Sequence, residues 1–401
     1  MQRSIFPLAL KLRRGFFLPL YEYFYNSMAG LYIHIPFCKQ ACHYCDFHFS
    51  TNLSKQDEMV SAIVRELEIQ QDYLTGDSLN SIYFGGGTPS LLSANQFSQI
   101  LNVINSRFRL NPSCEVTVEA NPDDLSISKL TALYSLGVNR LSIGIQSFDN
   151  HILKFLNRAH TEHQAIDCLE ASREAGFKNI SIDLIYAIPG QSISTLKSNV
   201  SRTFDFSPEH ISCYGLTIEE RTVFGTWLAK KKFQPVDESE NATQLEWLMQ
   251  EFSDAGYEQY EISNFCKPGY YSIHNSSYWK QEPYLGLGPG AHSYDRESRQ
   301  FNIKNNAKYL TAIHQGNVPY EKELLTLENK INEFLFTTLR TQWGCDTEKL
   351  EHLYNYTLMK EKQDQIDQLI SAGLMIAENH ILKLTHRGKL LADQISLDMM
   401  V

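Results

Sequence analysis

Residues 31–49 read Leu-Tyr-Ile-His-Ile-Pro-Phe-Cys-Lys-Gln-Ala-Cys-His-Tyr-Cys-Asp-Phe-His-Phe. Three of the eight cysteines of the chain, Cys38, Cys42 and Cys45, stand within eight residues of this stretch. They follow a short apolar run that is typical of a buried strand. Because the other cysteines are scattered singly, this clustering indicates a specific chemical role.

The cysteine spacing permits three interpretations. Offsets of four and seven residues place Cys38, Cys42 and Cys45 on one face of a helix, where free thiols behave as small hydrophobic groups. Alternatively, His43 or His48 completes a closed four-ligand zinc site. In the third interpretation, the thiolates bind an iron-sulfur cluster and leave one iron open to an exogenous ligand. The spacing alone leaves all three open.

Composition restricts the class of protein. The chain has 401 residues, of which 43% are hydrophobic, so it is long enough for two domains. Its net charge is −10, from 36 basic and 46 acidic residues, which argues against a sequence-independent nucleic-acid binder. The scattered cysteines do not form a secreted disulfide pattern and predict a reducing cytoplasm; they are Cys114, Cys168, Cys213, Cys266 and Cys345.

The first 27 residues stand apart from the rest. Two apolar runs, Ile5–Leu10 and Phe16–Leu20, are separated by basic residues, and neither reaches the length of a membrane span. Such a segment either lies on a membrane surface or precedes a true start at Met28. It is left out of the fold prediction.

From residue 31 onward, β-rich runs alternate with helical patterns. The predicted strands are Leu31–Ile35, Ser81–Phe84, Glu115–Glu119, Arg140–Ile145, Ile180–Ile185 and His210–Leu216. The predicted helices are Asp57–Tyr73, Ala94–Phe108, Ile127–Leu136, Thr161–Ala175 and Ile193–Asp205. This alternation predicts an α/β fold with a parallel sheet, and six units make a partial (β/α)6 barrel of the TIM type.

Polar and glycine residues gather where these strands end. Residues 85–89 read Gly-Gly-Gly-Thr-Pro, and Glu119, Gln146 and Asp183 stand at the ends of later strands. Polar residues at the carboxyl ends of barrel strands are typical of an active site. The glycines either form a plain turn or let the backbone approach a ligand. The carboxylates either cap the structure or accept hydrogen bonds from ribose hydroxyls.

Together these motifs resemble the radical S-adenosylmethionine superfamily. The resemblance rests on the cysteine triplet with its aromatic Tyr44, on the Gly-Gly-Gly-Thr-Pro loop, and on the segments Glu119-Ala-Asn-Pro and Gly144-Ile-Gln-Ser-Phe. It runs from about residue 31 to the C-terminus and is strongest for the branch of oxygen-independent coproporphyrinogen oxidases and the related haem chaperones.

The resemblance implies a 4Fe-4S cluster bound by Cys38, Cys42 and Cys45, whose open iron is chelated by S-adenosylmethionine. By matching motifs it also implies a set of residues that line the nucleotide site: Tyr32, Tyr44, Gly86, Gly87, Thr88, Glu119, Gln146, Arg158 and Asp183.

Two features bear on function within the branch. The oxidases carry a fourth cysteine two residues after the third, whereas this chain has Phe47. Residues 274–279 read His-Asn-Ser-Ser-Tyr-Trp and match a motif of the chaperones, which makes His274 the candidate haem-binding residue. His292, which follows a glycine-rich loop, is a second possible iron ligand, but the interpretation as a plain loop histidine is preferred. The resemblance therefore implies haem binding and delivery; the alternative is an oxygen-independent coproporphyrinogen III dehydrogenase, which carries out radical oxidative decarboxylation.

The C-terminal part is predicted to form a separate domain. Apolar residues repeat at helical spacing from Leu327, and two short strands flank Glu378-Asn-His, which resembles a winged helix. Residues 360–401 carry five basic and six acidic residues, so DNA binding is not predicted. The predicted division is an extension at 1–27, a barrel at 28–298, a connection at 299–320 and the C-terminal domain at 321–401.

The predicted partners are haem, an electron donor and a haem-accepting protein, with respiratory proteins among the acceptors considered. The predicted location is the cytoplasm. Homodimer formation and peripheral contact with the inner face of the membrane are kept open as further alternatives.

Overall fold

The computed structural model describes residues 28–74 and 78–401. Six parallel strands follow one another through the first half of the chain, each hydrogen-bonded to the next. They are β1 Met28–Ile35, β2 Ser78–Gly86, β3 Leu110–Ala120, β4 Arg140–Gln146, β5 Ile180–Tyr186 and β6 His210–Gly215. All six predicted strands are therefore present in the predicted parallel order.

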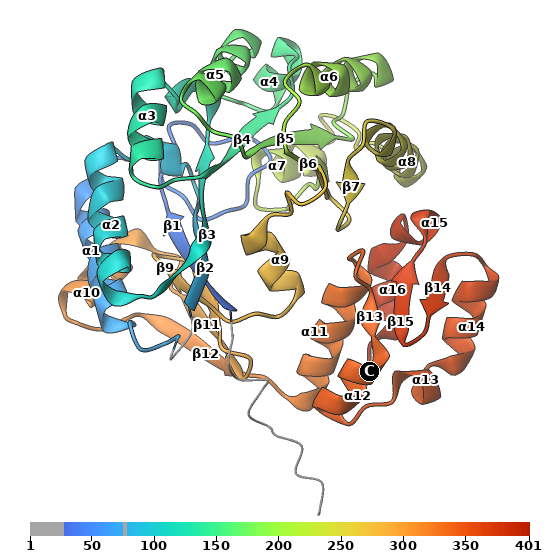
Figure 1. The fold of residues 1–401 in the computed structure, drawn as a ribbon. Coiled ribbons are helices and arrows are strands. Elements are labelled where there is room, and N and C mark those ends of the chain that lie inside the picture. Colours follow the sequence, from blue (N-terminus) through green and yellow to red (C-terminus); the bar gives the residue numbers. More distant parts are fainter. Residues whose placement is uncertain (1–27, 75–77) are drawn as a thin grey trace, which may run out of the picture.

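Helices connect these strands and cover the outside of the curved sheet, as Figure 1 shows. They are α1 Gln56–Ile69, α2 Ala94–Arg107, α3 Ile127–Ser135, α4 Asn150–Phe155, α5 Glu162–Glu174 and α6 Ile193–Asp205. Two of them begin with a capping box, in which Ser93 pairs with Gln96 and Thr161 pairs with Gln164. The strands between them bury apolar residues on both faces, as a helix-covered parallel sheet requires. The α/β partial-barrel prediction is confirmed.

The sheet extends beyond the six predicted strands. Its full order is β12-β11-β10-β9-β1-β2-β3-β4-β5-β6-β8-β7. The added strands and the helices near them are α7 Val223–Ala229, α8 Glu238–Asp254, β7 Glu258–Gln259, β8 Asn264–Cys266, α9 Ile273–Trp279, β9 Tyr284–Leu287, β10 His292–Tyr294, β11 Ser298–Asn302, α10 Asn306–His314 and β12 Tyr320–Leu324. Strand β9 pairs in parallel with β1. The region that follows β6 therefore extends the sheet at both edges, with β9 to β12 beside β1 and β8 and β7 beside β6.

Residues 299–320, the predicted connection between the domains, contain most of β11 and all of α10. Tyr309, Leu310 and Ile313 of α10 are buried in the same hydrophobic core as the barrel strands. The segment is a structural part of the barrel, because these apolar side chains pack against it.

The last part of the chain has its own core. It contains α11 Leu327–Leu339, β13 Cys345–Asp346, α12 Thr347–Tyr354, α13 Leu358–Glu361, α14 Gln363–Ser371, β14 Met375–Glu378, β15 Ile381–Leu384, α15 His386–Lys389 and α16 Ala392–Met399. The three strands form a separate small sheet, and the helices bury a separate apolar cluster. This is the winged-helix-like arrangement that was predicted. We propose that the domain boundary lies at about residue 325, since the barrel sheet ends at β12.

A buried carboxylate joins α1 to the strands that complete the barrel. The carboxylate of Glu66 accepts hydrogen bonds from the backbone N–H of Gly288 at 2.7 Å and from the side chains of Tyr309, Asn302 and Gln70. The side chain is fully buried, and burial raises its pKa to about 7 despite these donors. Glu66 thus holds the loop between β9 and β10 in place.

We expect the Glu66→Gln variant to be less stable by about 1–3 kcal/mol at pH 7, because an amide NH2 would face buried N–H and O–H donors. The folded protein binds this proton more tightly than the unfolded chain, so the contribution of Glu66 to stability is present at low pH and is lost as pH rises through about 7. Urea unfolding of the cluster-free protein between pH 5 and 8 measures this effect. The free energy of unfolding should fall less steeply with rising pH in the variant than in the unaltered protein. Equal slopes in both would contradict this role, and Glu68→Gln on the same helix is the matched control.

No helix among residues 28–74 and 78–401 combines the length and apolarity needed to cross a bilayer. The predicted membrane-surface segment at residues 1–27 lies outside the described residues.

Candidate functional site

A cavity of about 810 Å³ opens at the carboxyl ends of the parallel strands. Every residue predicted for the cluster, for the nucleotide site and for haem contributes to its lining: Cys38, Cys42, Cys45, Tyr32, Tyr44, Gly86, Gly87, Thr88, Glu119, Gln146, Arg158, Asp183 and His274. A volume of this size accommodates a ligand as large as a nucleoside. Parallel strands end at the same edge of a sheet, which is why residues from β1 to β6 and from the loops after them meet here.

The cysteines lie on an irregular loop between β1 and α1. The loop is closed at its base, where the backbone N–H of Cys38 donates to the carbonyl of Ser50 at 3.1 Å and that of Ser50 donates to Pro36 at 2.9 Å. None of the residues 38–48 is helical. The interpretation that places the three cysteines on one helix face is therefore wrong.

The two histidines of the zinc interpretation have other partners. His43 Nδ1 is hydrogen-bonded to the carbonyl of Phe155 at 2.9 Å, and His48 Nε2 to Asn306 Oδ1 at 2.7 Å. Within the described ranges, no three His, Cys, Asp or Glu side chains are close enough together to hold a single metal ion. A cubane cluster has a different requirement, because each thiolate binds its own iron.

Polar donors accompany the cysteine sulfurs. The hydroxyl of Thr88 donates to Cys38 Sγ at 3.3 Å, and Arg158 Nη1 donates to Cys42 Sγ at 3.4 Å. Burial raises the pKa of Cys38 to about 12 and that of Cys45 to about 11, so the unligated thiols are protonated at neutral pH. Three soft ligands around one cavity, with a cation and a hydroxyl beside them, fit an anionic iron-sulfur cluster.

Arg158 connects the cysteine loop to the strand ends. Its Nη1 also donates to the hydroxyl of Tyr44 at 3.3 Å, while Nη2 donates to Asn121 Oδ1 at 2.6 Å and to the carbonyl of Gly144 at 2.7 Å. A guanidinium suits this position because its planar fork of donors serves several acceptors at once. The cation therefore orients three separate segments around the cavity.

The glycine loop lies against the cysteine loop. The backbone N–H of Gly87 donates to the carbonyl of Ile35 at 2.9 Å. A Cβ atom on Gly87 would lie 2.6 Å from the carbonyl oxygen of Phe37 and 2.7 Å from that of Ile35. Only glycine permits this approach, so the loop is more than a plain turn.

Two half-buried carboxylates also line the cavity. Glu119 accepts from the hydroxyl of Tyr83 at 2.8 Å and from the backbone N–H of Gly86 at 3.1 Å, and Asp183 accepts from Ser142 at 3.2 Å. Burial raises the pKa of Glu119 to about 7 and that of Asp183 to about 6. Each carboxyl group can therefore accept hydrogen bonds toward the cavity, or donate one when it is protonated.

Tyr83 and Arg140 are among the lining residues that the sequence interpretation did not assign. Arg140 is 2% exposed and lies beside Glu115, with Nε 3.9 Å from a carboxylate oxygen. Its position at the start of β4 carries no motif. Side chains alternate between the two faces of a strand, so Tyr83 points to the same face of β2 as Ser81. This alternation is the sequence signal that could have identified Tyr83.

His274 occupies a different environment from the one expected of an open haem ligand. Its ring is 2% exposed, with Nδ1 hydrogen-bonded to Ser81 Oγ at 2.8 Å and Nε2 to the hydroxyl of Tyr278 at 2.7 Å. It also stacks on Tyr83, with ring centroids 4.8 Å apart. Burial lowers its pKa to about 3, so the imidazole is neutral, but both nitrogens already have partners. Iron ligation by His274 would require breaking one of these hydrogen bonds.

Comparisons with known proteins agree with this geometry. The family model described as the Radical SAM superfamily matches residues 32–201, and that of the HemN C-terminal domain matches residues 325–391. The solved coproporphyrinogen III oxidase (HemN) of Escherichia coli, a radical SAM enzyme, has a TM-score of 0.81 with 22% identity over 94% of this chain and 91% of its own, a likeness of fold alone.

Two curated relatives match most of the sequence. The haem chaperone HemW of Bacillus subtilis is 36% identical over 92% of this chain and 98% of its own length. The haem chaperone HemW of Escherichia coli is likewise 36% identical, over 91% of this chain and 96% of its own. The chain belongs to the HemW family within the radical SAM superfamily.

Proposed function

We propose that the protein binds haem and delivers it to proteins that require haem, with a 4Fe-4S cluster and S-adenosylmethionine as cofactors. The observation that carries this proposal is the identity of 36% along nearly the whole length of curated haem chaperones. Membership in the radical SAM superfamily supports both cofactors. The chain's own contribution is a cavity whose thiols, donors and carboxylates suit them.

The alternative is oxidative decarboxylation of coproporphyrinogen III. It is less well supported, because the solved oxidase shares 22% identity and its branch carries a cysteine where this chain has Phe47. Phe47 is 71% exposed and lines the cavity. An apolar ring at that position cannot supply a thiol or a thiolate to chemistry in the cavity.

We further propose roles for the lining residues. Cys38, Cys42 and Cys45 hold the cluster, which when bound supplies one-electron chemistry to S-adenosylmethionine. Thr88 and Arg158 place a hydroxyl and a positive charge beside the sulfurs, which offsets the negative charge of bound thiolates.

The other predicted residues are proposed to orient the nucleotide. Tyr32 and Tyr44 offer aromatic surface, the backbone of Gly86 and Gly87 admits close approach, and three polar side chains accept or donate hydrogen bonds, namely Glu119, Gln146 and Asp183. His274 is proposed to position Tyr278 and Tyr83 through the contacts described above.

An absorbance titration tests the proposed function. Haemin is added to anaerobically purified, cluster-reconstituted protein, and the haem-loaded protein is then mixed with an apo-haemoprotein as acceptor. We expect a saturable Soret shift at stoichiometric haemin and its transfer to the acceptor. Absence of saturable binding, together with conversion of coproporphyrinogen III under reducing conditions with S-adenosylmethionine, would establish the alternative instead.

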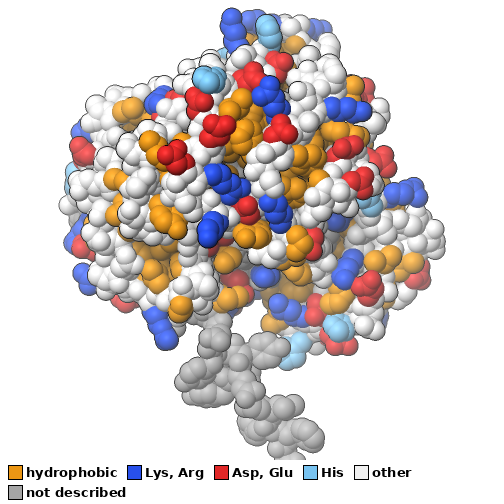
Figure 2. Space-filling view, turned by 45° about the horizontal axis from the view of Figure 1, so that its top comes forward, with side chains coloured by type: hydrophobic (Ala, Val, Ile, Leu, Met, Phe, Trp, Pro, Cys, Tyr) orange, Lys and Arg blue, Asp and Glu red, His pale blue; other side chains and the backbone are white. Residues whose placement is uncertain are grey.

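The proposed location is the cytoplasm, supported by eight cysteines that are all free thiols. Figure 2 shows Lys and Arg side chains interspersed with Asp and Glu over the face it draws. It stays a prediction that the protein binds no nucleic acid. The acceptor, the electron donor, homodimer formation and membrane contact stay predictions as well.

A further inference from the structure

A second cavity, of about 460 Å³, lies between the added edge of the barrel and the C-terminal domain. Its walls come from β1, α9, the strands β9 to β11 and helix α11. Tyr32, Asp46, Phe47, Tyr278 and Lys304 line this cavity and the larger one as well, so the two adjoin. A molecule bound here would therefore lie next to the cluster and nucleotide site.

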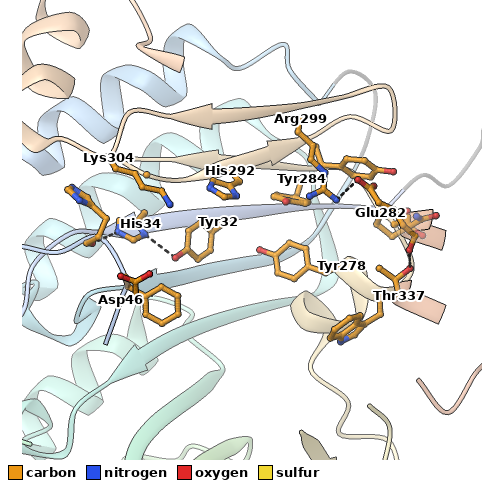
Figure 3. A pocket seen from close by; sticks show the side chains of 17 residues that line it. Tyr32, His34, Asp46, Tyr278, Glu282, Tyr284, His292, Arg299, Lys304 and Thr337 are labelled. Atoms are coloured by element: carbon orange, nitrogen blue, oxygen red, sulfur yellow. Dashed lines mark hydrogen bonds and ion pairs between the residues drawn. The ribbon is translucent and has the colours of Figure 1, made fainter. Parts of the chain in front are cut away.

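Aromatic side chains form a large part of the lining of this second cavity. Tyr278, Trp279, Tyr284 and Tyr294 all line it. The rings of Tyr278 and Tyr284 are in edge contact, with centroids 4.7 Å apart, and Figure 3 shows both side chains directed toward the cavity. Flat apolar walls of this kind suit a planar macrocycle.

Three histidines line the cavity, and they differ in their hydrogen bonds. His34 uses both ring nitrogens, with Tyr32 at 3.1 Å and the carbonyl of His48 at 2.8 Å, and His48 uses Nε2. Among the residues that the structure describes, neither ring nitrogen of His292 has a hydrogen-bond partner. Its side chain is exposed where it lines the cavity, and partial desolvation together with the charges of Lys304 and Arg299 lowers its pKa, so the neutral form prevails. A neutral imidazole with an unused nitrogen is a ready iron ligand.

The backbone that carries His292 is held firmly. Gly286 N–H donates to Ser293 Oγ at 3.0 Å, and the loop before His292 is bonded to Glu66 through Gly288. The imidazole packs edge-on against Phe301, with centroids 4.7 Å apart. The ring is therefore presented from a fixed strand rather than from a free loop.

Cations flank the histidine. In Figure 3, His292 lies between Lys304 and Tyr284, with Arg299 beyond them. Arg299 is paired with Glu333 of α11 at 2.9 Å. Lys304 forms no ion pair with any residue in the described part of the chain. The acidic lining residues are Asp46, Glu282 and Glu333. An ammonium group without a partner beside an apolar cavity fits a carboxylate on a bound ligand.

We propose that this cavity seats the haem, with His292 as an iron ligand, the tyrosines and Trp279 against the macrocycle, and Lys304 toward a propionate. This inference rests on the proposed function and names the site at which it is carried out. It revises the interpretation of His292 as a plain loop residue. The bond formed is a coordinate bond from an imidazole lone pair to iron, which requires no oxidant or reductant.

Haemin titration of the full-length protein and its variants tests the site. In His292→Ala we expect the dissociation constant to rise by at least about tenfold, with a shifted Soret band. His292→Met should restore saturable binding with a third Soret position, because a thioether replaces the imidazole. Lys304→Glu should weaken binding without moving the Soret band, since the ligand is retained. His314→Ala, on the exposed face of α10, should behave as the unaltered protein.

The outcomes separate the two proposals. If the unaltered protein fails to bind haemin saturably, the proposed function is overturned. If it binds and both His292 variants keep its affinity and its spectrum, the proposed site alone is wrong. Loss of the iron-ligand signature in His274→Ala but not in His292→Ala, with unchanged melting temperatures, would assign the ligand to His274 and likewise overturn this inference.

Discussion

Replacement of Cys42 by alanine should reduce the iron content of the purified protein to background and abolish its brown colour. Cys42 lies between the other two cysteines in the loop and receives a hydrogen bond from Arg158 at 3.4 Å. The other predicted nucleotide-site residues offer no thiol to take its place, and the cluster already has one iron without a protein ligand. Two remaining thiolates cannot hold a cubane cluster against loss to solvent.

The measurement is iron and sulfide analysis after anaerobic reconstitution, with the absorption spectrum beside it. Cys168→Ala is the matched control, because Cys168 is a buried free thiol on α5, away from the cavity. The control should retain iron and colour. An unchanged iron content in Cys42→Ala would show that the assignment of the cluster ligands is wrong. A colourless unaltered protein with stoichiometric zinc would support the zinc interpretation instead.

The parts of the fold that the sequence predicted are those governed by local patterns. Strands β1 to β6 alternate with helices that have regular apolar spacing and, in α2 and α5, capping boxes. The candidate site was predictable for a related reason. Residues such as Glu119 and Gln146 stand at the ends of β3 and β4, and parallel topology brings strand ends together without further information.

The remaining features depend on contacts between distant segments. Strand β9 is four residues long and contains Gly286, so it carries little strand signal; its place is set by pairing with β1 about 250 residues earlier. The hydrogen bonds of His274 could not be predicted from the sequence either, because its partner Ser81 is 193 residues away in the chain. The second cavity arises where β10, α9 and α11 meet, which no single segment reveals.

A large steric effect within the candidate site should come from Gly87→Ala. A Cβ at this position would lie within 2.8 Å of three backbone atoms of residues 35 and 37, and backbone cannot move aside as a flexible side chain can. The glycine loop and the loop that carries Cys38 would have to separate. We expect the free energy of unfolding to fall by about 1–3 kcal/mol and the affinity for S-adenosylmethionine to fall by roughly tenfold or more.

Calorimetric titration of S-adenosylmethionine and urea unfolding measure the two effects separately. Gly137→Ala is the control, because its Cβ would meet nothing within 4 Å although its φ is +92°. That variant should lose about 1–2 kcal/mol of stability to the left-handed backbone and bind the nucleotide normally. If Gly87→Ala binds S-adenosylmethionine as tightly as the unaltered protein does, the glycine loop is not part of the nucleotide site. A loss of binding in Gly87→Ala alone would tie the spacing of the two loops directly to cofactor recognition.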